Sequence, residues 1–365
     1  MSITTTTQIS APVNNVFQVT LLRNAKARCP YFAGSVPAEI AEHMGTFTAK
    51  WRRIENLSVP TAALSELSGN LSFPTRNAVQ PSITDLTATV AKFGNFIYLT
   101  EEVDLMNFSG QTDKLMEILG INAGQAINRQ QRNVLEDNAT AILVGGATTA
   151  TNISGGSTAS SNVKVSDIAV VSNALGRNDA MMFTPMTTGS VNVGTSAIRP
   201  AYVGFCHTDT EEDIRAITGF IASQNYASQT ELWPGEFGAV GAVRFISTTE
   251  GGIDTGTGTA GTGSSTGHGR AATSGRTDVY NTPIIGMEAV GSVGFGFQHV
   301  KTAYMAGDKL PGVQVISHPR GSAGSADPLN EVASLGWKSW TAGLVLNSNW
   351  TRVLRHTVDR LQTNE

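Results

Sequence analysis

Three groups of residues in this chain of 365 have types and spacings that could support chemistry. The first is Gly256-x-Gly258-x-x-Gly261, the spacing of a dinucleotide-binding turn, in which glycines let backbone N–H groups approach a pyrophosphate. No helix pattern follows it, and the stretch 251–275 is so rich in Gly, Thr and Ser that this spacing arises by chance. No Gly-Lys-Ser/Thr phosphate loop occurs either. We therefore expect no nucleotide cofactor.

The second group is Cys206 and His207, followed by Asp209, Glu211 and Glu212. Thiolate, imidazole and carboxylate groups are metal ligands, but acidic residues also stabilise the first turn of a helix. We interpret these residues as a helix start and expect no metal site. The six histidines are dispersed, without a His-Glu-x-x-His or Gly-x-Ser-x-Gly motif, so the sequence predicts no catalytic residues and no enzyme.

The third group consists of four arginines: Arg52, Arg53, Arg129 and Arg132. A guanidinium group pairs with carboxylates through two parallel hydrogen bonds, which suits contacts with a neighbouring molecule. Together with Trp51, these arginines are our candidate contacts between subunits. A solvated polar face explains the arginines equally well.

Trp51 and the first two arginines lie on a predicted hairpin that projects from the body of the protein. Its first flank, 46–52, alternates apolar and polar residues, and the return flank, 85–90, repeats the pattern. Prolines and scattered Ser, Asn and Gly occupy the residues between the flanks, so the tip has no core of its own. Such a projection needs a neighbouring surface to lie on.

The other two arginines lie on a long helix that we predict from Asp113 to Leu143, where apolar residues recur at helical spacing. At the usual rise per residue this helix is about 45 Å long. Gly120 and Gly124 each cost about 1 kcal/mol relative to Ala, which predicts a bend or a close backbone contact. We interpret the polar stretch 128–133 as a solvated or subunit-facing surface. Beyond residue 161, alternating strand and helix patterns predict a compact α/β lobe.

Charged residues make up 15% of the chain, against roughly 25% in typical soluble domains, and Thr, Ser, Asn and 38 glycines fill the difference. A Thr- and Gly-rich β protein with long loops has this composition. So does a protein whose surface is covered by other subunits, because charges are depleted there, and we favour this second explanation. The formal net charge of −4 argues against direct readout of nucleic acid.

Cys29 and Cys206 are far apart in the sequence, which predicts unpaired structural thiols and fits a reducing compartment. The N-terminus has no secretory signal pattern, and no run of 18 apolar residues occurs. We therefore expect a protein that is neither exported by the general secretory route nor inserted in a membrane.

The order of these parts resembles the major capsid protein of tailed bacteriophages, the Hong Kong 97-like fold. Three passages resemble the coliphage N-four type of head protein more closely: Phe93–Glu102, Leu232–Ile246 and Gly336–Trp340. The resemblance implies an α+β fold with the following parts: an N-terminal arm at 1–45; an extended β-hairpin, the E-loop, at 46–84; a peripheral domain at 85–160 and 300–325 with a spine helix at 113–143; and an α/β axial domain at 161–299 and 326–365 with a Gly-rich loop at 251–275.

The resemblance also implies a function. The chain would self-assemble into hexamers and pentamers of an icosahedral virion shell that encloses double-stranded DNA without sequence-specific contacts. Scaffolding, portal and decoration proteins would be its partners, and assembly would take place in the host cytoplasm. Two alternatives stay open: an encapsulin-like nanocompartment shell with protein cargo, and a cytoplasmic α/β enzyme that uses the loop Gly256–Gly261.

Overall fold

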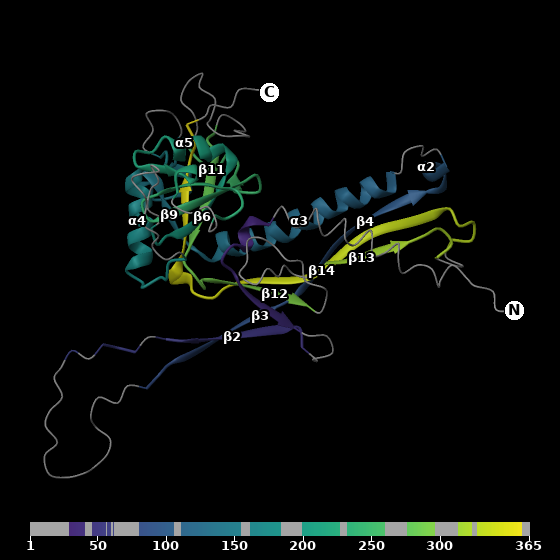
Figure 1. Ribbon diagram of the computed structural model, residues 1–365, viewed down its shortest axis with the longest axis horizontal. Helices are drawn as coiled ribbons and strands as arrows, with labels where there is room; N and C mark the ends of the chain where they lie inside the picture. Colours follow the sequence, from purple (N-terminus) through teal and green to yellow (C-terminus); the bar gives the residue numbers. More distant parts are fainter. Residues whose placement is uncertain are drawn as a thin grey trace, which may run out of the picture.

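The computed structural model shows an α/β lobe, an elongated sheet with a long helix along it, and a projecting hairpin (Figure 1). It describes residues 29–40, 46–55, 57–59, 61, 80–105, 111–154, 161–183, 199–226, 232–259, 276–295, 313–322 and 327–359. The predicted α+β class is confirmed, because both kinds of element contribute to the core.

The α/β lobe is built on an eight-stranded sheet with the order β5-β15-β11-β6-β9-β8-β7, and β10 also pairs with β11. Helix α4 packs on it because Ile168, Val171 and Leu175 recur at helical spacing and all three are buried. The elements are β5 (Thr140–Leu143), α4 (Val165–Gly176), β6 (Tyr202–His207), α5 (Glu211–Arg215), β7 (Phe220–Ala222), β8 (Glu236–Val240), β9 (Val243–Thr248), β10 (Gly252–Asp254), β11 (Val279–Ile285) and β15 (Thr351–His356).

The elongated body is a five-stranded sheet in which β14 pairs with β4, β12 and β13, and β1 pairs with β12. Helix α3 covers one face, where Leu119 and Ile127 pack with Leu335 and Trp337. The elements are β1 (Val36–Ile40), β4 (Ala91–Thr100), α2 (Glu101–Leu105), α3 (Gln111–Asn138), β12 (Val290–Phe295), β13 (Val313–His318) and β14 (Val332–Val345). No helix in the described ranges has both the length and the apolar run needed to cross a bilayer.

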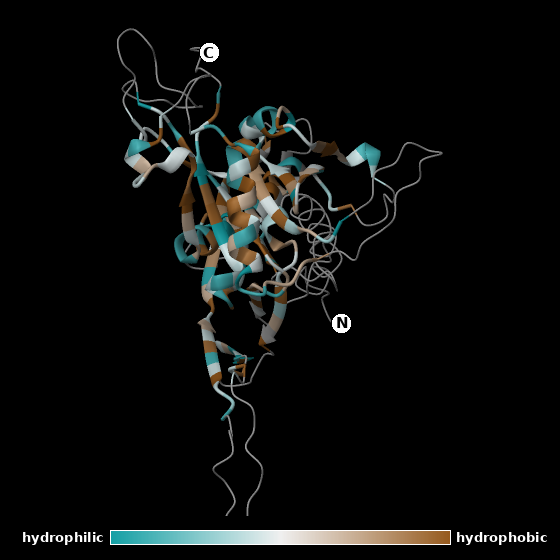
Figure 2. Ribbon diagram, turned by 90° about the vertical axis from the view of Figure 1, so that its left-hand side faces the viewer, coloured by the Kyte–Doolittle hydropathy of each residue, from teal (hydrophilic) through white to brown (hydrophobic). Residues whose placement is uncertain are grey.

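The predicted hairpin is present as β2 (Thr48–Ile54) and β3 (Ile83–Thr89), paired antiparallel with Ala49 opposite Ala88. Buried or half-buried residues alternate with exposed ones on both strands, as the sequence predicts. Figure 2 shows the alternation of hydrophobic and hydrophilic residues along the hairpin as it leaves the body. The predicted tip, 62–79, lies outside the described residues.

The long helix ends earlier than predicted. It stops at Asn138, and residues 140–143 form β5, which pairs in parallel with β15. The polar stretch 128–133 also differs from prediction, because Asn128 and Gln131 are buried within the chain rather than solvated. The side chain of Asn128 accepts a hydrogen bond from the backbone N–H of Tyr31, and that of Gln131 lies against Gly343. Contacts distant in sequence therefore decide both features.

Strand pairing groups the chain differently from the predicted domain division. Strands β12 and β14 lie within the predicted axial segments 161–299 and 326–365, yet they pair with each other and β14 pairs with β4. The sequence period identifies a strand but not its neighbour. The assignment of peripheral and axial domains, and of the arm at 1–45, stays a prediction.

The α3 packing can be tested with two isoleucines of the same helix. Replacing Ile127, which is 1% exposed, by Ala removes apolar contacts with the sheet and is expected to lower the free energy of unfolding by about 2 to 4 kcal/mol. Ile118→Ala, at an exposed position, is expected to change it by less than about 0.5 kcal/mol. Urea unfolding monitored by circular dichroism measures both, and equal losses would contradict the packing.

Candidate subunit interface

The base of the hairpin is held by the body of its own chain. Ala49, Trp51, Ala88 and Val90 form a buried or half-buried cluster with residues of β1, β12 and β14. The Trp51 ring lies against Gly291, where a Cβ would collide with it. Trp51 is thus an anchor within the subunit. This packing fixes the direction in which the hairpin leaves the body.

Beyond the base, the hairpin exposes apolar side chains. Val59 is 83% exposed and Ile54 is 69% exposed, and Leu57 and Ile83 are also mostly accessible. We call Ile54, Leu57, Val59 and Ile83 the hairpin surface. Exposed apolar residues that lie together indicate a contact site, because an isolated subunit gains nothing from leaving them in water.

Both faces of the hairpin carry paired charges. Lys50 and Arg52 both contact the Asp85 carboxylate, at 2.6 and 3.0 Å, and hold the pKa of Asp85 below its usual value. Arg53 binds Glu55 and donates a hydrogen bond to the carbonyl oxygen of Leu346. These pairs satisfy the arginines within the subunit and leave the apolar side chains as the exposed feature.

A second exposed apolar area lies on the sheet face opposite α3. Phe96 and Tyr98 of β4 are 61% and 66% exposed, and their rings meet edge to face at 5.1 Å. Their strand neighbours Ile97 and Leu99 point to the other face and pack on α3. Sequence reasoning did not identify this area. The signal was available, since β4 carries large apolar residues at both parities and therefore predicts a sheet covered on both faces.

Two glycines turn this face into a groove. At Gly94 a Cβ would lie 2.5 Å from the carbonyl oxygen of Trp337, and at Gly336 a Cβ would lie 2.9 Å from the Cβ of Phe96. The groove has a volume of about 550 Å³. We call its apolar residues Phe93, Phe96, Tyr98 and Ile316 the sheet surface.

The predicted helix arginines connect two parts of the same chain. Arg129 Nε donates to a carboxylate oxygen of Glu250, and Arg132 Nη1 donates to the carbonyl oxygen of the same residue at 2.9 Å. All five predicted contact residues therefore have partners within the subunit. A contact of Trp51, Arg52, Arg53, Arg129 or Arg132 with another subunit stays a prediction.

The predicted helix start in Cys206–Glu212 is present, because α5 begins at Glu211. The His207 ring accepts a hydrogen bond from the backbone N–H of Asp209, and the acids open α5. Burial raises the pKa of the Cys206 thiol, and of Cys29, to about 12, so neither forms a reactive thiolate. No group of three or more acidic, His or Cys side chains within the described ranges could hold a metal ion.

The glycine loop uses its N–H groups within the chain. Gly256 N–H donates to Asp278 Oδ1 at 2.7 Å, and Gly258 N–H donates to the Thr277 carbonyl oxygen at 2.8 Å. A phosphate would need these same donors. Gly261 lies outside the described residues. The described part of the loop thus gives no support to the enzyme alternative.

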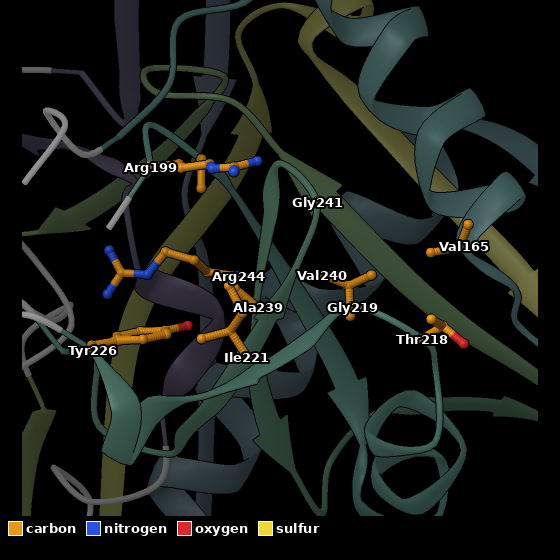
Figure 3. A pocket seen from close by; sticks show the side chains of 11 residues that line it. Val165, Arg199, Thr218, Gly219, Ile221, Tyr226, Ala239, Val240, Gly241 and Arg244 are labelled. Carbon is orange, nitrogen blue, oxygen red and sulfur yellow. The ribbon is translucent and has the colours of Figure 1, made fainter. Parts of the chain in front are cut away.

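The passage Leu232–Ile246 contains a buried ion pair that sequence reasoning missed. Arg244 is 2% exposed and binds both carboxylate oxygens of Glu236 at 2.6 Å. The pair joins β8 to β9, and Glu236 also accepts from the backbone N–H of Trp233. The Glu236 carboxylate neutralises the charge of Arg244 at the edge of a cavity of about 380 Å³. Arg199, Arg244 and Tyr226 all line this cavity (Figure 3).

Comparison of the whole structure with solved structures gives several matches of very low sequence identity. The capsid of Ralstonia phage GP4 is 10% identical, with 92% of this chain and 93% of that chain covered and a TM-score of 0.57. The capsid structure of cyanophage P-SCSP1u is 10% identical, with 91% and 89% covered and a TM-score of 0.52. The head structure of Helicobacter pylori bacteriophage KHP40 is also 10% identical, with 91% of each chain covered and a TM-score of 0.50.

This chain has the fold of bacteriophage capsid proteins. The match spans about nine tenths of both chains, so it includes the lobe, the elongated sheet and α3 together. No protein-family model and no curated protein matches the sequence. At 10% sequence identity, what this chain shares with these capsid structures is the arrangement of helices and strands and not particular side chains.

The contribution of the buried Glu236–Arg244 pair to stability can be compared with that of an exposed pair in the same lobe. Glu236→Gln leaves the Arg244 charge buried without its counter-charge and is expected to destabilise the protein by about 3 to 5 kcal/mol. Glu211→Gln disrupts the exposed pair with Arg215 and is expected to cost less than about 0.5 kcal/mol. Denaturant unfolding distinguishes the two, and a small loss in Glu236→Gln would contradict the structural importance of the pair.

Proposed function

We propose that this chain is the major capsid protein of a tailed phage, and that it assembles into hexamers and pentamers of an icosahedral shell around double-stranded DNA. The observation that carries the proposal is that one subunit bears two separate exposed apolar surfaces. The hairpin surface extends from one side, and the sheet surface lies on an arm directed elsewhere (Figure 1).

The described strands of the hairpin leave their anchored base in a direction away from β4 and β13 of their own chain (Figure 1). The two surfaces can be buried if the hairpin of one subunit lies on the sheet of the next. Such a contact is heterologous, joining different patches on the two partners, and heterologous contacts close into rings when the rotation permits. Rings joined by further contacts form a shell. Permanent contacts of this kind typically bury more than roughly 2,000 Å².

The remaining parts of the proposal rest on the charge of the chain and on its resemblance to phage capsid proteins. With a formal net charge of −4, the chain would hold DNA by confinement and counterions rather than by specific contacts. The protein would be structural and not an enzyme, would use no cofactor, and would act in the virion after assembly in the host cytoplasm. Scaffolding, portal and decoration proteins are its proposed partners. An encapsulin-like shell is the second candidate, and particles that contain an enzyme instead of DNA would favour it.

Polar substitutions on each surface test the proposed contact. Phe96→Ser/Tyr98→Ser and Ile54→Ser/Val59→Ser each remove apolar area worth about 3 kcal/mol per contact, which raises the concentration needed for assembly more than about a hundredfold. We expect folded subunits that do not sediment as particles. Val170→Ser, at an exposed position on α4, is the control and is expected to assemble normally. Normal particles from both double variants would contradict the contact.

Deletion of residues 64–78 tests the hairpin tip, which lies outside the described residues. Because the tip has no visible core in the sequence, the shortened subunit is expected to keep its thermal unfolding midpoint and to lose shell formation. Circular dichroism and electron microscopy of the same preparation measure the two properties. Shells of normal size from the deleted chain would refute a role of the tip in assembly.

A further inference from the structure

The last turns of α3 contact the lobe in two ways. Leu135 is buried against Val203, Phe205 and Ile246, and a polar layer lies beside this apolar contact. We call the polar layer the helix–lobe junction. It comprises residues 128–138 of α3 with strands β10, β11 and β15. Glu136 lies at its centre, with a side chain only 13% exposed. Its carboxylate lies directly against Gly252 of β10, where a Cβ would collide with both oxygens. A larger residue at 252 would therefore displace Glu136.

The described surroundings of the Glu136 carboxyl group give it few hydrogen bonds and no cation at hydrogen-bonding distance. Its Oε1 atom is buried and has no hydrogen-bond partner among the described residues. The nearest cation, Arg132, is 3.8 Å away and donates its hydrogen bonds to Glu250 and Asn133 instead. The Asn281 amide donates to Asp254 at 3.3 Å, and its hydrogen bonding with the Glu136 carboxylate only partly offsets the burial. A buried carboxylate with this little compensation costs much more free energy than a neutral carboxylic acid at the same place.

Every element around Glu136 adds polar or charged groups, and both acids and bases are among them. Arg129 is already paired with Glu250. Burial is the main cause of a raised Glu136 pKa, and Asp254 and Asp137 add to it, while Arg132 and Asn281 oppose it; the resulting pKa is about 7. The groups are Arg132 and Asp137 on α3, Glu250 before β10, Asp254 on β10, Asn281 on β11, Arg355 opposite Asn281 on β15, and Tyr31 of the turn Pro30–Phe32.

We propose that Glu136 is a proton-sensitive lock between α3 and the lobe. Protonated Glu136 stays packed on Gly252 and keeps the helix seated on β10. Ionised Glu136 moves toward water, and the last turns of α3 separate more often from the lobe. This inference goes beyond shell formation, because it concerns the interior of a single subunit and can be tested on unassembled protein.

The direction of the pH effect follows from the raised pKa. Between the ordinary value of 4.5 and the folded value of about 7, the closed junction binds a proton that the open junction releases. The stabilisation is therefore complete below pH 4.5 and is lost as the pH rises through about 7. Opening of the junction is expected to increase by up to roughly thirtyfold between pH 5.5 and 8.5.

Hydrogen exchange on the unassembled full chain measures this opening. Protection factors, corrected for the intrinsic pH dependence of exchange, are expected to fall over 133–138 and 252–254 as the pH rises. Glu136→Gln cannot ionise, so its protection factors are expected to stay constant. Glu117→Gln, at an exposed position on the same helix, is the control and should behave like the unmodified chain. An identical pH response in Glu136→Gln would overturn the proposal.

A second variant tests the electrostatic cause without changing Glu136. Asp254→Asn removes the facing negative charge, so the midpoint of the pH response is expected to shift to lower pH. Titration of the Glu136 carboxyl carbon by NMR reports the same midpoint independently. An unshifted midpoint, or ionisation of Glu136 near pH 4.5 in the unmodified chain, would contradict the lock.

Discussion

The packing of α3 against two different bodies is the constraint on which the rest of the structure depends. Residues 116–127 place Met116, Leu119 and Ile127 on the five-stranded sheet, where they form an apolar core. Beyond them, Leu135 packs on apolar residues of the lobe, while Asn128, Gln131 and Glu136 make close polar contacts with the turn Pro30–Phe32, β14 and β10. One continuous helix therefore fixes the lobe relative to the sheet.

The exposed surfaces follow from this frame. Since α3 covers one face of the five-stranded sheet, the aromatic residues of β4 that point to the other face are left without a cover in the described part of the chain. The hairpin base is fixed on the same sheet through Trp51 and Val90, so its apolar residues are carried away from the body. The proposed shell would bury both surfaces, and the stability of each subunit would then be partly collective.

The sequence predicted those features that depend on local period. Alternation along 46–52 and 85–90 predicted the hairpin, and the alternating strand and helix patterns beyond residue 161 predicted the α/β lobe. It did not predict partners. The pairing of β5 with β15 ended α3 early, and the burial of Asn128 depended on the backbone of Tyr31, which is 97 residues away. The large apolar residues at both parities of β4 indicate a strand covered on both faces, but nothing local indicates which face the helix will cover.

Electron cryo-microscopy of particles formed by the purified full-length chain, with and without a candidate scaffolding protein, tests the central claim most directly. The account predicts closed shells, or sheets and tubes with a hexameric lattice, in which the hairpin of one subunit covers Phe96 and Tyr98 of its neighbour. A persistent monomer or small oligomer under both conditions, or a lattice in which both surfaces stay exposed to solvent, would contradict it.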